Sequence, residues 1–339
     1  EHYKFEGSIK TMTIVFMILG VLGAVWAFFD NGGWNHNSRF WSNFLLNSYY
    51  FNGMAITAVF FIAAHTIGYG GWIFSMRRIF ESFSSFIIVG FICFLIIVLG
   101  LVFDWHSLYH HWTHPAVGDT IVGDKKAFLN IGSYAFFAVL FFAGWIIFSQ
   151  WMKRHSLSSD HSVDDIAYNQ KGKYISAGYI VAFGVGSSVF SWLAVMSLDP
   201  HWYSTLFGWY NFASYMCGFL CMVIIVVTIL RAKGLLAFVN ESHMHNINMF
   251  LFGFSVFWTY LWFSQFMLQW YGNIPEDTMW FVKRFDVPMF KILFWVAFIL
   301  NFVFPFLFLM KRSAKRKPWI YGIAAVIILF GVYLVNKKK

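Results

Sequence analysis

Residues 174–230 read YISAGYIVAFGVGSSVFSWLAVMSLDPHWYSTLFGWYNFASYMCGFLCMVIIVVTIL, and this stretch decides the fold. It contains two apolar runs, each of which is about 20 residues long and therefore able to cross a bilayer as a helix. The short polar run Leu198–Gly208 lies between them. A chain that leaves a membrane and re-enters it within so few residues is predicted to form antiparallel membrane helices.

The composition of the whole chain agrees with a membrane protein. Hydrophobic residues make up 59%, charged residues 12%, and the mean hydropathy is +0.63 over 339 residues. A soluble domain of this size cannot bury so large an apolar fraction. Strands of a β-barrel would show alternating runs of about ten residues, which the long apolar runs exclude. We therefore expect an all-α polytopic transmembrane helical bundle.

Nine apolar runs are long enough to be membrane spans. They cover about residues 9–29, 44–67, 82–103, 127–149, 174–197, 207–230, 246–268, 287–310 and 318–336. The longest polar connections, 104–126 and 150–173, are too short to form separate domains. Residues 1–339 are therefore predicted to be a single integral membrane domain.

The basic residues indicate the orientation of these spans. The net charge is +9, but the Lys and Arg residues lie in short loops, which is typical of a topology signal and excludes a nucleic-acid-binding patch. The N-terminus and alternate loops carry fifteen of them, and the opposite loops carry six. This excess predicts a cytoplasmic N-terminus and an outer position for the 198–208 run. Lys337 to Lys339 then fall outside in a nine-span chain, so we expect either that the last span is misplaced or that a tenth span, which would return the chain inward, is missing from this sequence.

No metal or covalently bound cofactor is expected on this chain. Cys93, Cys217 and Cys221 lie within apolar runs and form no haem-attachment motif, which favours a packing role. The histidine-rich run 103–114 lacks the short-spaced ligand set of a structural zinc site.

Ionisable groups inside a membrane or at its edge are candidate functional residues, because they lose part of their hydration there. The candidates for a proton relay are Glu81 on the inner side, His65 in the interior of the second span, and Asp104, Asp199 and His201 on the outer side. Glu81 follows Arg77 and Arg78 at helical spacing, so a structural ion pair is the favoured interpretation there. His65 is equally compatible with a hydrogen bond to a neighbouring helix.

Four blocks of sequence carry a resemblance to a known family. They are Leu198–Tyr210 (LDPHWYSTLFGWY), Phe254–Tyr260 (FSVFWTY), Trp262–Phe266 (WFSQF) and Trp270–Glu276 (WYGNIPE). With these blocks the chain resembles the second, smaller NrfD-like membrane subunit of bacterial alternative complex III. The family is also similar to the membrane subunit of polysulfide reductase. The resemblance runs through most of the chain and implies about ten spans, arranged as two successive four-helix bundles with flanking helices.

The resemblance implies a place in a quinol:electron-acceptor oxidoreductase of the bacterial cytoplasmic membrane. Electrons from quinol would pass through iron–sulfur clusters and c-type haems on periplasmic partner subunits, while this chain would carry no cofactor itself. The implied partners are a paralogous larger NrfD-like subunit, the periplasmic redox subunits and a terminal oxidase. Within this chain, Asp199, His201 and Tyr203 are candidates for contact with quinone, and the relay candidates are candidates for proton translocation.

Two other functions are compatible with the same sequence. A purely structural subunit would dock the redox partners and pair its polar groups among themselves. A secondary transporter would show broken helices in matching positions of two repeats. Paired breaks of that kind do not appear in the sequence, so the transporter is disfavoured.

Overall fold

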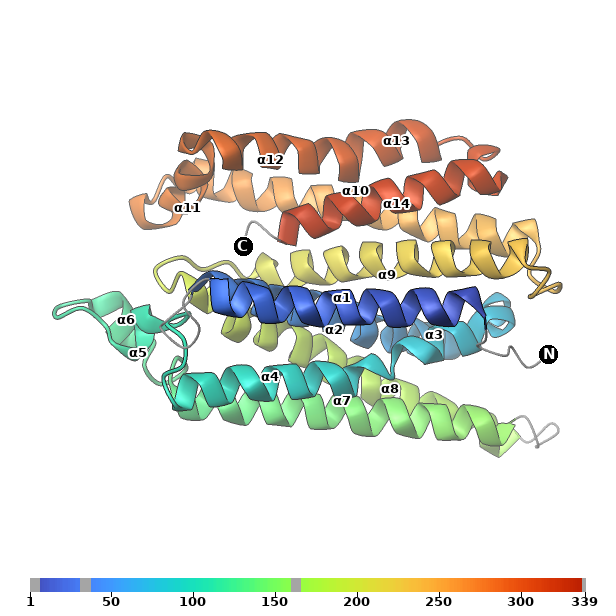
Figure 1. Ribbon diagram of the computed structural model, residues 1–339, viewed down its shortest axis with the longest axis horizontal. Helices are drawn as coiled ribbons and strands as arrows, with labels where there is room; N and C mark the ends of the chain where they lie inside the picture. The colour runs from blue at the N-terminus through green and yellow to red at the C-terminus, as the bar shows by residue number, and fades with distance from the viewer. Residues whose placement is uncertain (1–6, 31–37, 160–165, 337–339) are drawn as a thin grey trace.

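The computed structural model describes residues 7–30, 38–159 and 166–336, and within them it contains helices and no strands. The long helices run nearly side by side along the longest axis of the molecule (Figure 1). Eight helical segments are long and apolar enough to cross a membrane, and the shorter apolar helix 318–334 follows them. Eight of the nine predicted spans are therefore confirmed for the described residues, as is the all-α polytopic bundle, and the ninth is present as a shorter apolar helix. Lys337 to Lys339 lie outside the described residues.

The first four-helix bundle is built by four consecutive long helices. They are α2 (Ser38–Ile67), α4 (Phe86–Val102), α7 (Ile131–Ser159) and α8 (Ile166–Ala194). Each packs on two others of the set: α2 on α4 and α8, and α7 on the same two. The contacts therefore close a ring, with residues such as Phe94, Phe142 and Phe190 buried inside it.

The second bundle contains the next four spans. They are α9 (Leu206–Ala232), α10 (Glu241–Gly272), α12 (Pro288–Phe298) with its continuation α13 (Phe304–Leu309), and α14 (Pro318–Asn336). Helix α9 packs on α10 and α14, and the α12–α13 segment packs on the same two helices. The expected two successive four-helix bundles are thus present.

Two glycines allow the bundles to approach each other closely along α2 and α9. A Cβ placed on Gly53 of α2 would lie 2.4 Å from the ring of Tyr215, and one on Gly218 of α9 would lie 2.5 Å from the hydroxyl of Tyr50. Each tyrosine therefore occupies the space that the glycine of the facing helix leaves open. Small residues that admit a large neighbour are typical of tightly packed membrane helices.

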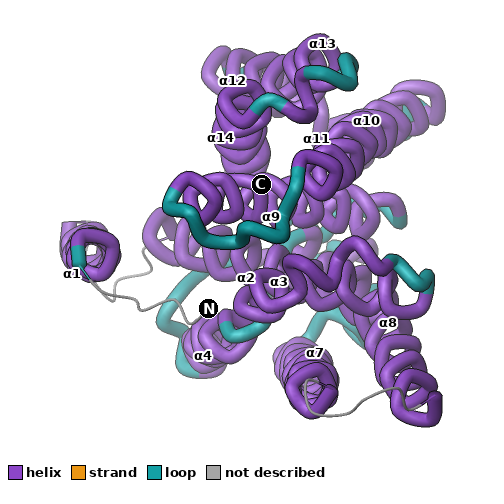
Figure 2. Tube along the Cα trace, turned by 90° about the vertical axis from the view of Figure 1, so that its right-hand side faces the viewer, coloured by secondary structure: helices purple, strands orange, loops and turns teal. Residues whose placement is uncertain are grey.

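Helix α1 (Ser8–Asp30) flanks the two bundles and lies apart from them in Figure 2. Its large apolar side chains, such as Met17 and Trp26, are exposed. Contact with α2 is made near its end, where the ring centroids of Phe28 and Phe40 lie 5.3 Å apart. An apolar helix exposed on this scale fits a lipid environment.

The α12–α13 span is interrupted by a π-helical turn over Ile299–Val303. Pro305 has no N–H to donate to the carbonyl of Asn301 four residues earlier, and its ring crowds that carbonyl. The hydrogen-bond ladder relaxes into a wider turn at this position, which is the usual way in which such irregularities arise.

Short elements cover the two ends of the molecule. Helices α5 (His110–Thr113), α6 (Thr120–Asp124) and α11 (Pro275–Asp286) lie at one end with the 3₁₀ turn η2 (Met196–Leu198), and we call this the Asp199 end (Figure 1). The 3₁₀ turns η1 (Gly71–Met76) and η4 (Ala314–Arg316) lie with α3 (Arg77–Phe83) at the opposite end, which we call the Glu81 end.

Candidate functional site

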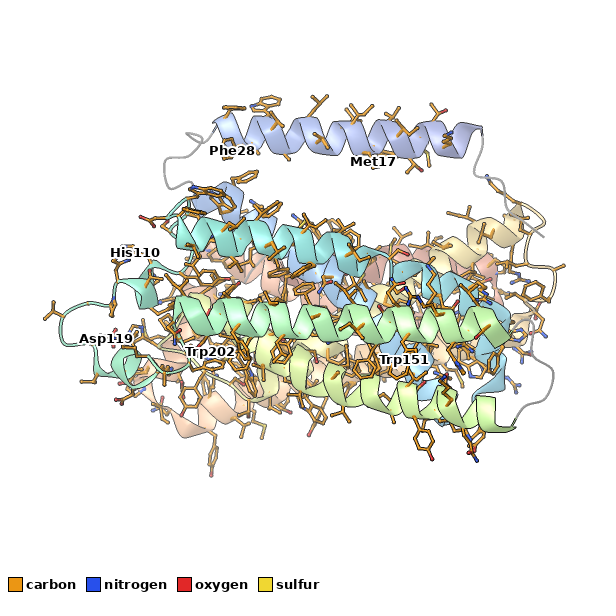
Figure 3. The ribbon with its side chains drawn as sticks, turned by 90° about the horizontal axis from the view of Figure 1, so that it is seen from below. Met17, Phe28, His110, Asp119, Trp151 and Trp202 are labelled. Atoms are coloured by element: carbon orange, nitrogen blue, oxygen red, sulfur yellow. The ribbon has the colours of Figure 1, made fainter. Side chains whose placement is uncertain are left out.

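Three segments that are distant in sequence meet at the Asp199 end. They are the connection 103–130, the turn 199–205 before α9, and helix α11. Figure 3 shows His110, Asp119 and Trp202 gathered at this end of the molecule, whereas Trp151 lies toward the other end. The structure thus brings the sequence candidates Asp199, His201 and Tyr203 together with residues of two other segments.

His201 forms the link to the connection 103–130. Its Nε2 lies 2.8 Å from Oδ2 of Asp119. The other carboxylate oxygen of Asp119 accepts the backbone N–H of Val122 at 3.2 Å and caps α6. The hydrogen bond from that backbone N–H lowers the pKa of Asp119 most, and the contact with His201 lowers it further. Asp119 therefore stays ionised and holds both α6 and the imidazole.

Lys125 makes a second link between the same two segments. Its Nζ donates to the carbonyl oxygen of Pro200 at 2.5 Å and lies 5.3 Å from the centre of the Tyr203 ring. Burial lowers the pKa of Lys125, while the carboxylates of Asp277, Asp119 and Asp199 act in the opposite direction. Three carboxylates of this end thus favour the charged form of Lys125.

Asp199 links its turn to α11. Its Oδ2 lies 3.8 Å from Nζ of Lys283, and its backbone carbonyl accepts the N–H of Trp202 at 3.1 Å. Tyr203 is 58% exposed. The three side chains of the predicted quinone contact, Asp199, His201 and Tyr203, therefore lie in one turn. They are on its solvent side, and each lies next to a charged residue of another segment.

Trp202 connects this turn to a half-buried cation, Arg284. Its ring is 2% exposed and stacks on Trp280 of α11, with the centroids 4.4 Å apart and an interplanar angle of 11°. The guanidinium carbon of Arg284 lies 3.2 Å from the centre of the Trp280 ring. Since two groups cannot stack on the same face of one ring, Trp280 lies between Trp202 and Arg284.

Asp104 and His106 follow the end of α4 in a turn. Asp104 is exposed and adopts a φ of 55°, and the next N–H, of Trp105, donates to the carbonyl of Gly100 at 2.8 Å. His106 is buried, and its Nε2–H donates to the carbonyl of Ile97 at 3.0 Å. Burial lowers the pKa of His106. His106 is therefore held neutral and acts as a cap for a carbonyl of α4.

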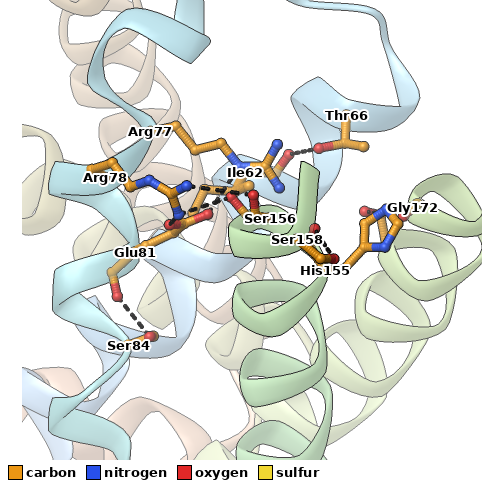
Figure 4. A network of polar contacts seen from close by, with 11 residues as sticks. Ile62, Thr66, Arg77, Arg78, Glu81, Ser84, His155, Ser156, Ser158 and Gly172 are labelled. Atoms are coloured by element: carbon orange, nitrogen blue, oxygen red, sulfur yellow. Dashed lines mark hydrogen bonds and ion pairs between the residues drawn. The ribbon is translucent and has the colours of Figure 1, made fainter. Parts of the chain in front are cut away.

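Glu81 lies at the other end of the molecule in an ion-pair network (Figure 4). Its carboxylate accepts from Nε of Arg77 at 2.9 Å and from a terminal nitrogen of Arg78 at 2.7 Å. Arg78 also donates to the hydroxyl of Ser156 on α7 at 3.1 Å. The predicted pairing of Glu81 with both arginines is confirmed, and it joins α3 to α7.

His65 lies at a different depth from the one expected. It occupies the last turn of α2, two residues before the helix ends at Ile67, and not the interior of the span. Its Nδ1–H donates to the carbonyl of Phe61 at 2.8 Å, and its ring lies 5.1 Å from Trp72 and 5.4 Å from Phe250. The expectation was wrong because the apolar run 44–67 itself ends two residues after His65, where α2 also ends. His65 therefore belongs to the Glu81 end.

A set of buried hydroxyl groups extends from the Asp199 end into the first bundle and was not identified from the sequence. Tyr109 donates to the carbonyl of Ala194 at 2.8 Å and lies 2.9 Å from the hydroxyl of Tyr134. Deeper in the first bundle, Tyr49 donates to Ser191 at 2.7 Å. A hydroxyl inside an apolar run signals a buried hydrogen bond, but the sequence does not tell which residue is the partner.

Among the residues that the structure describes, no group of three or more His, Cys, Asp or Glu side chains lies close enough together to hold a metal ion. Comparison with known protein families gives no match, and comparison with curated proteins gives no detectably similar sequence. The class of the protein therefore rests on its own fold. It is a polytopic helical membrane protein of two successive four-helix bundles, with a charged and aromatic cluster at the Asp199 end.

Proposed function

We propose that the chain is an integral membrane subunit of a respiratory quinol:electron-acceptor oxidoreductase, of the alternative complex III type. The observation that carries the proposal is the arrangement of the spans as two successive four-helix bundles flanked by α1. The resemblance of the sequence blocks implies the same organisation. Helix α11, which begins within the fourth block at Pro275, also approaches the first block, because Nζ of Lys283 lies 3.8 Å from Asp199.

The distribution of basic residues supports an orientation in the bacterial cytoplasmic membrane. The Glu81 end carries most of the Lys and Arg residues, so we place it and the N-terminus in the cytoplasm. The Asp199 end then faces the periplasm. Iron–sulfur and c-type cytochrome subunits would dock there, and the larger paralogous subunit and a terminal oxidase would complete the assembly. In this proposal the haem and the clusters belong to the partners.

The polar groups of the chain suit proton transfer at the two surfaces. Glu81 and His65 would serve the cytoplasmic side, and the exposed groups Asp104, Asp199 and His201 would serve the periplasmic side. In the described part of the chain, the long helices carry hydroxyl groups between these ends, such as Tyr49 and Ser191. A proton path through the first bundle would therefore run over hydroxyls and water.

A purely structural role is the second candidate, and one observation favours it. Glu81 is satisfied by two arginines, so its carboxylate has a packing function whether or not it carries protons. In this alternative the chain docks the redox subunits at the Asp199 end and takes no part in proton or quinone chemistry.

A panel of variants in the assembled complex separates the two roles. Asp199→Asn, His65→Leu and Glu81→Gln are each measured for quinol oxidation and for proton release per electron in proteoliposomes. A proton role predicts that at least one variant lowers proton release while the complex retains its subunits. If all three variants retain wild-type rates and stoichiometry in a complete complex, the chain is a scaffold.

A further inference from the structure

An apolar groove opens on the side of the second bundle, between α10 and α12. Its volume is about 560 Å³, and its wall is almost entirely aromatic and aliphatic. Tyr260 and Phe263 at its rim are 63% and 50% exposed, on a face that a transmembrane bundle turns toward lipid. The groove is therefore accessible from the bilayer.

A smaller inner cavity adjoins the groove. Trp262, Phe294 and Phe298 line both spaces. The inner cavity has a volume of about 40 Å³, enough for one or two water-sized groups, and its lining adds Gln265 and Arg284. Gln265 lies seven residues before the end of α10 at Gly272, roughly 10 Å along the helix axis. The two polar groups thus face an enclosed space below the Asp199 end.

Both polar groups offer hydrogen-bond donors to this space. Gln265 is 4% exposed, and its Nε2 has no hydrogen-bond partner among the described residues. Arg284 uses one terminal nitrogen to donate to the carbonyl of Trp280 at 2.6 Å. Burial lowers the pKa of Arg284 to about 10, which the nearby Tyr210 and Asp199 offset only in part. A buried donor that lacks an acceptor is costly, so an acceptor atom in the cavity would be stabilising.

We propose that the groove and cavity together bind a membrane lipid with a flat, carbonyl-bearing head, the chemistry of a prenylated quinone. One carbonyl oxygen enters the cavity and accepts from Nε2 of Gln265 and from Arg284. The ring lies against the indole of Trp262, and the hydrocarbon tail follows the groove between α10 and α12 into the bilayer.

The shape of the site selects this chemistry over a phospholipid headgroup. A phosphate group presents four oxygens and needs several donors on different sides. One face of the Arg284 guanidinium is already covered by the Trp280 ring. Aromatic walls, by contrast, suit a flat conjugated ring. The π-helical turn Ile299–Val303 follows Phe298 and contains Phe302, both of the groove wall, and such turns are frequent at functional sites.

This site differs from the turn Asp199 to Tyr203, which the sequence suggested for quinone contact. The turn affects the cavity indirectly. Trp202 stacks on Trp280 and thereby holds in place the indole against which the guanidinium of Arg284 packs. The inference extends the proposed function without needing the partner subunits. Binding is tested on the full chain alone, so its failure is distinguishable from failure of the proposed assembly.

The test uses the full chain in phosphatidylcholine nanodiscs and decylubiquinone as the probe. Competition by decylubiquinone against a photoactivatable azidoquinone is measured, and the labelled peptides are mapped. We expect labelling of residues 256–302 in the wild type. Gln265→Leu removes one donor hydrogen bond and weakens competition about three- to tenfold. Gln269→Leu, the same change one helical turn away and outside the cavity lining, serves as the matched control and retains wild-type competition.

A second variant guards against a structural effect of the first. Val256→Trp adds bulk at the exposed wall of the groove, where Val256 is 36% exposed, and is expected to abolish labelling without changing the melting temperature. Equal competition in wild type, Gln265→Leu and Val256→Trp would overturn the proposal. So would labelling that disappears when a quarter of the lipid is replaced by phosphatidylglycerol, since the occupant would then be an anionic phospholipid.

Discussion

The imidazole of His201 lies 2.8 Å from the carboxylate of Asp119 and joins two segments that are 82 residues apart in sequence. Because Asp119 also caps α6, this contact fastens the connection 103–130 over the turn that begins α9. We predict that His201→Gln increases hydrogen exchange in residues 114–124 while the long helices remain unchanged. Asp119→Asn retains an oxygen for the α6 cap and should have the same effect. Unchanged exchange in both variants would show that the contact does not hold the connection.

The acid stability of the protein should depend on His106. Burial lowers the pKa of His106 in the folded state, whereas the unfolded chain has the ordinary value near 6.5. The unfolded state therefore binds the extra proton first, and stability falls as the pH drops from about 6.5 toward the lowered folded pKa. The slope for one proton is at most about 1.4 kcal/mol per pH unit.

His106→Gln retains a donor for the carbonyl of Ile97 and removes the titration. The measurement is thermal unfolding in detergent at intervals from pH 8 to pH 5. The variant should lose less stability on acidification than the wild type. Parallel curves for the two proteins would contradict the assignment of this pH dependence to His106.

The contact between the bundles should be sensitive to a single methyl group at Gly53. An added Cβ would lie 2.4 Å from the Tyr215 ring, so Gly53→Ala forces α2 and α9 apart or displaces the ring. We expect a loss of about 1–3 kcal/mol, the usual cost of overpacking a core. Gly184→Ala on α8 is the control, because nothing lies within 4 Å of its added Cβ. The two variants are compared by urea unfolding, and equal stability would refute the close packing.

The network at the Glu81 end should contribute measurably to folding. Glu81 is 7% exposed at its side chain and neutralises Arg77, which is 15% exposed. Glu81→Gln leaves the guanidinium buried without a carboxylate, and we expect a loss of roughly 2–4 kcal/mol, below the upper range for fully buried pairs. The exposed Glu241 at the start of α10 provides the control, and Glu241→Gln should cost less than about 1 kcal/mol. Similar losses in both variants would show that the pairing is not specific.

The fold was predictable because each membrane helix contains an apolar run that is long enough to cross a bilayer. The ends of the helices were not, since α10 continues at both ends beyond its apolar run 246–268 to cover Glu241–Gly272. Helix α2 starts at Ser38, well before the apolar part of the sequence.

Only some residues of the candidate site could be predicted from the sequence. Asp199 and His201 stand out because acidic and basic groups are rare beside apolar runs. Asp119, Lys125 and Arg284 resemble ordinary loop charges, and their importance arises from contacts across 75 to 82 residues of chain or from burial under Trp280. Local spacing carries no information about such contacts.

The most direct test of the central claim is purification of the affinity-tagged chain from its native membranes in a mild detergent. The absorption spectrum of the reduced sample and its rate of quinol-dependent cytochrome c reduction are then recorded. The account predicts a complex that contains c-type haem and a larger homologous membrane subunit, and that oxidises quinol. A chain that purifies alone, without haem and without quinol oxidation, would contradict it.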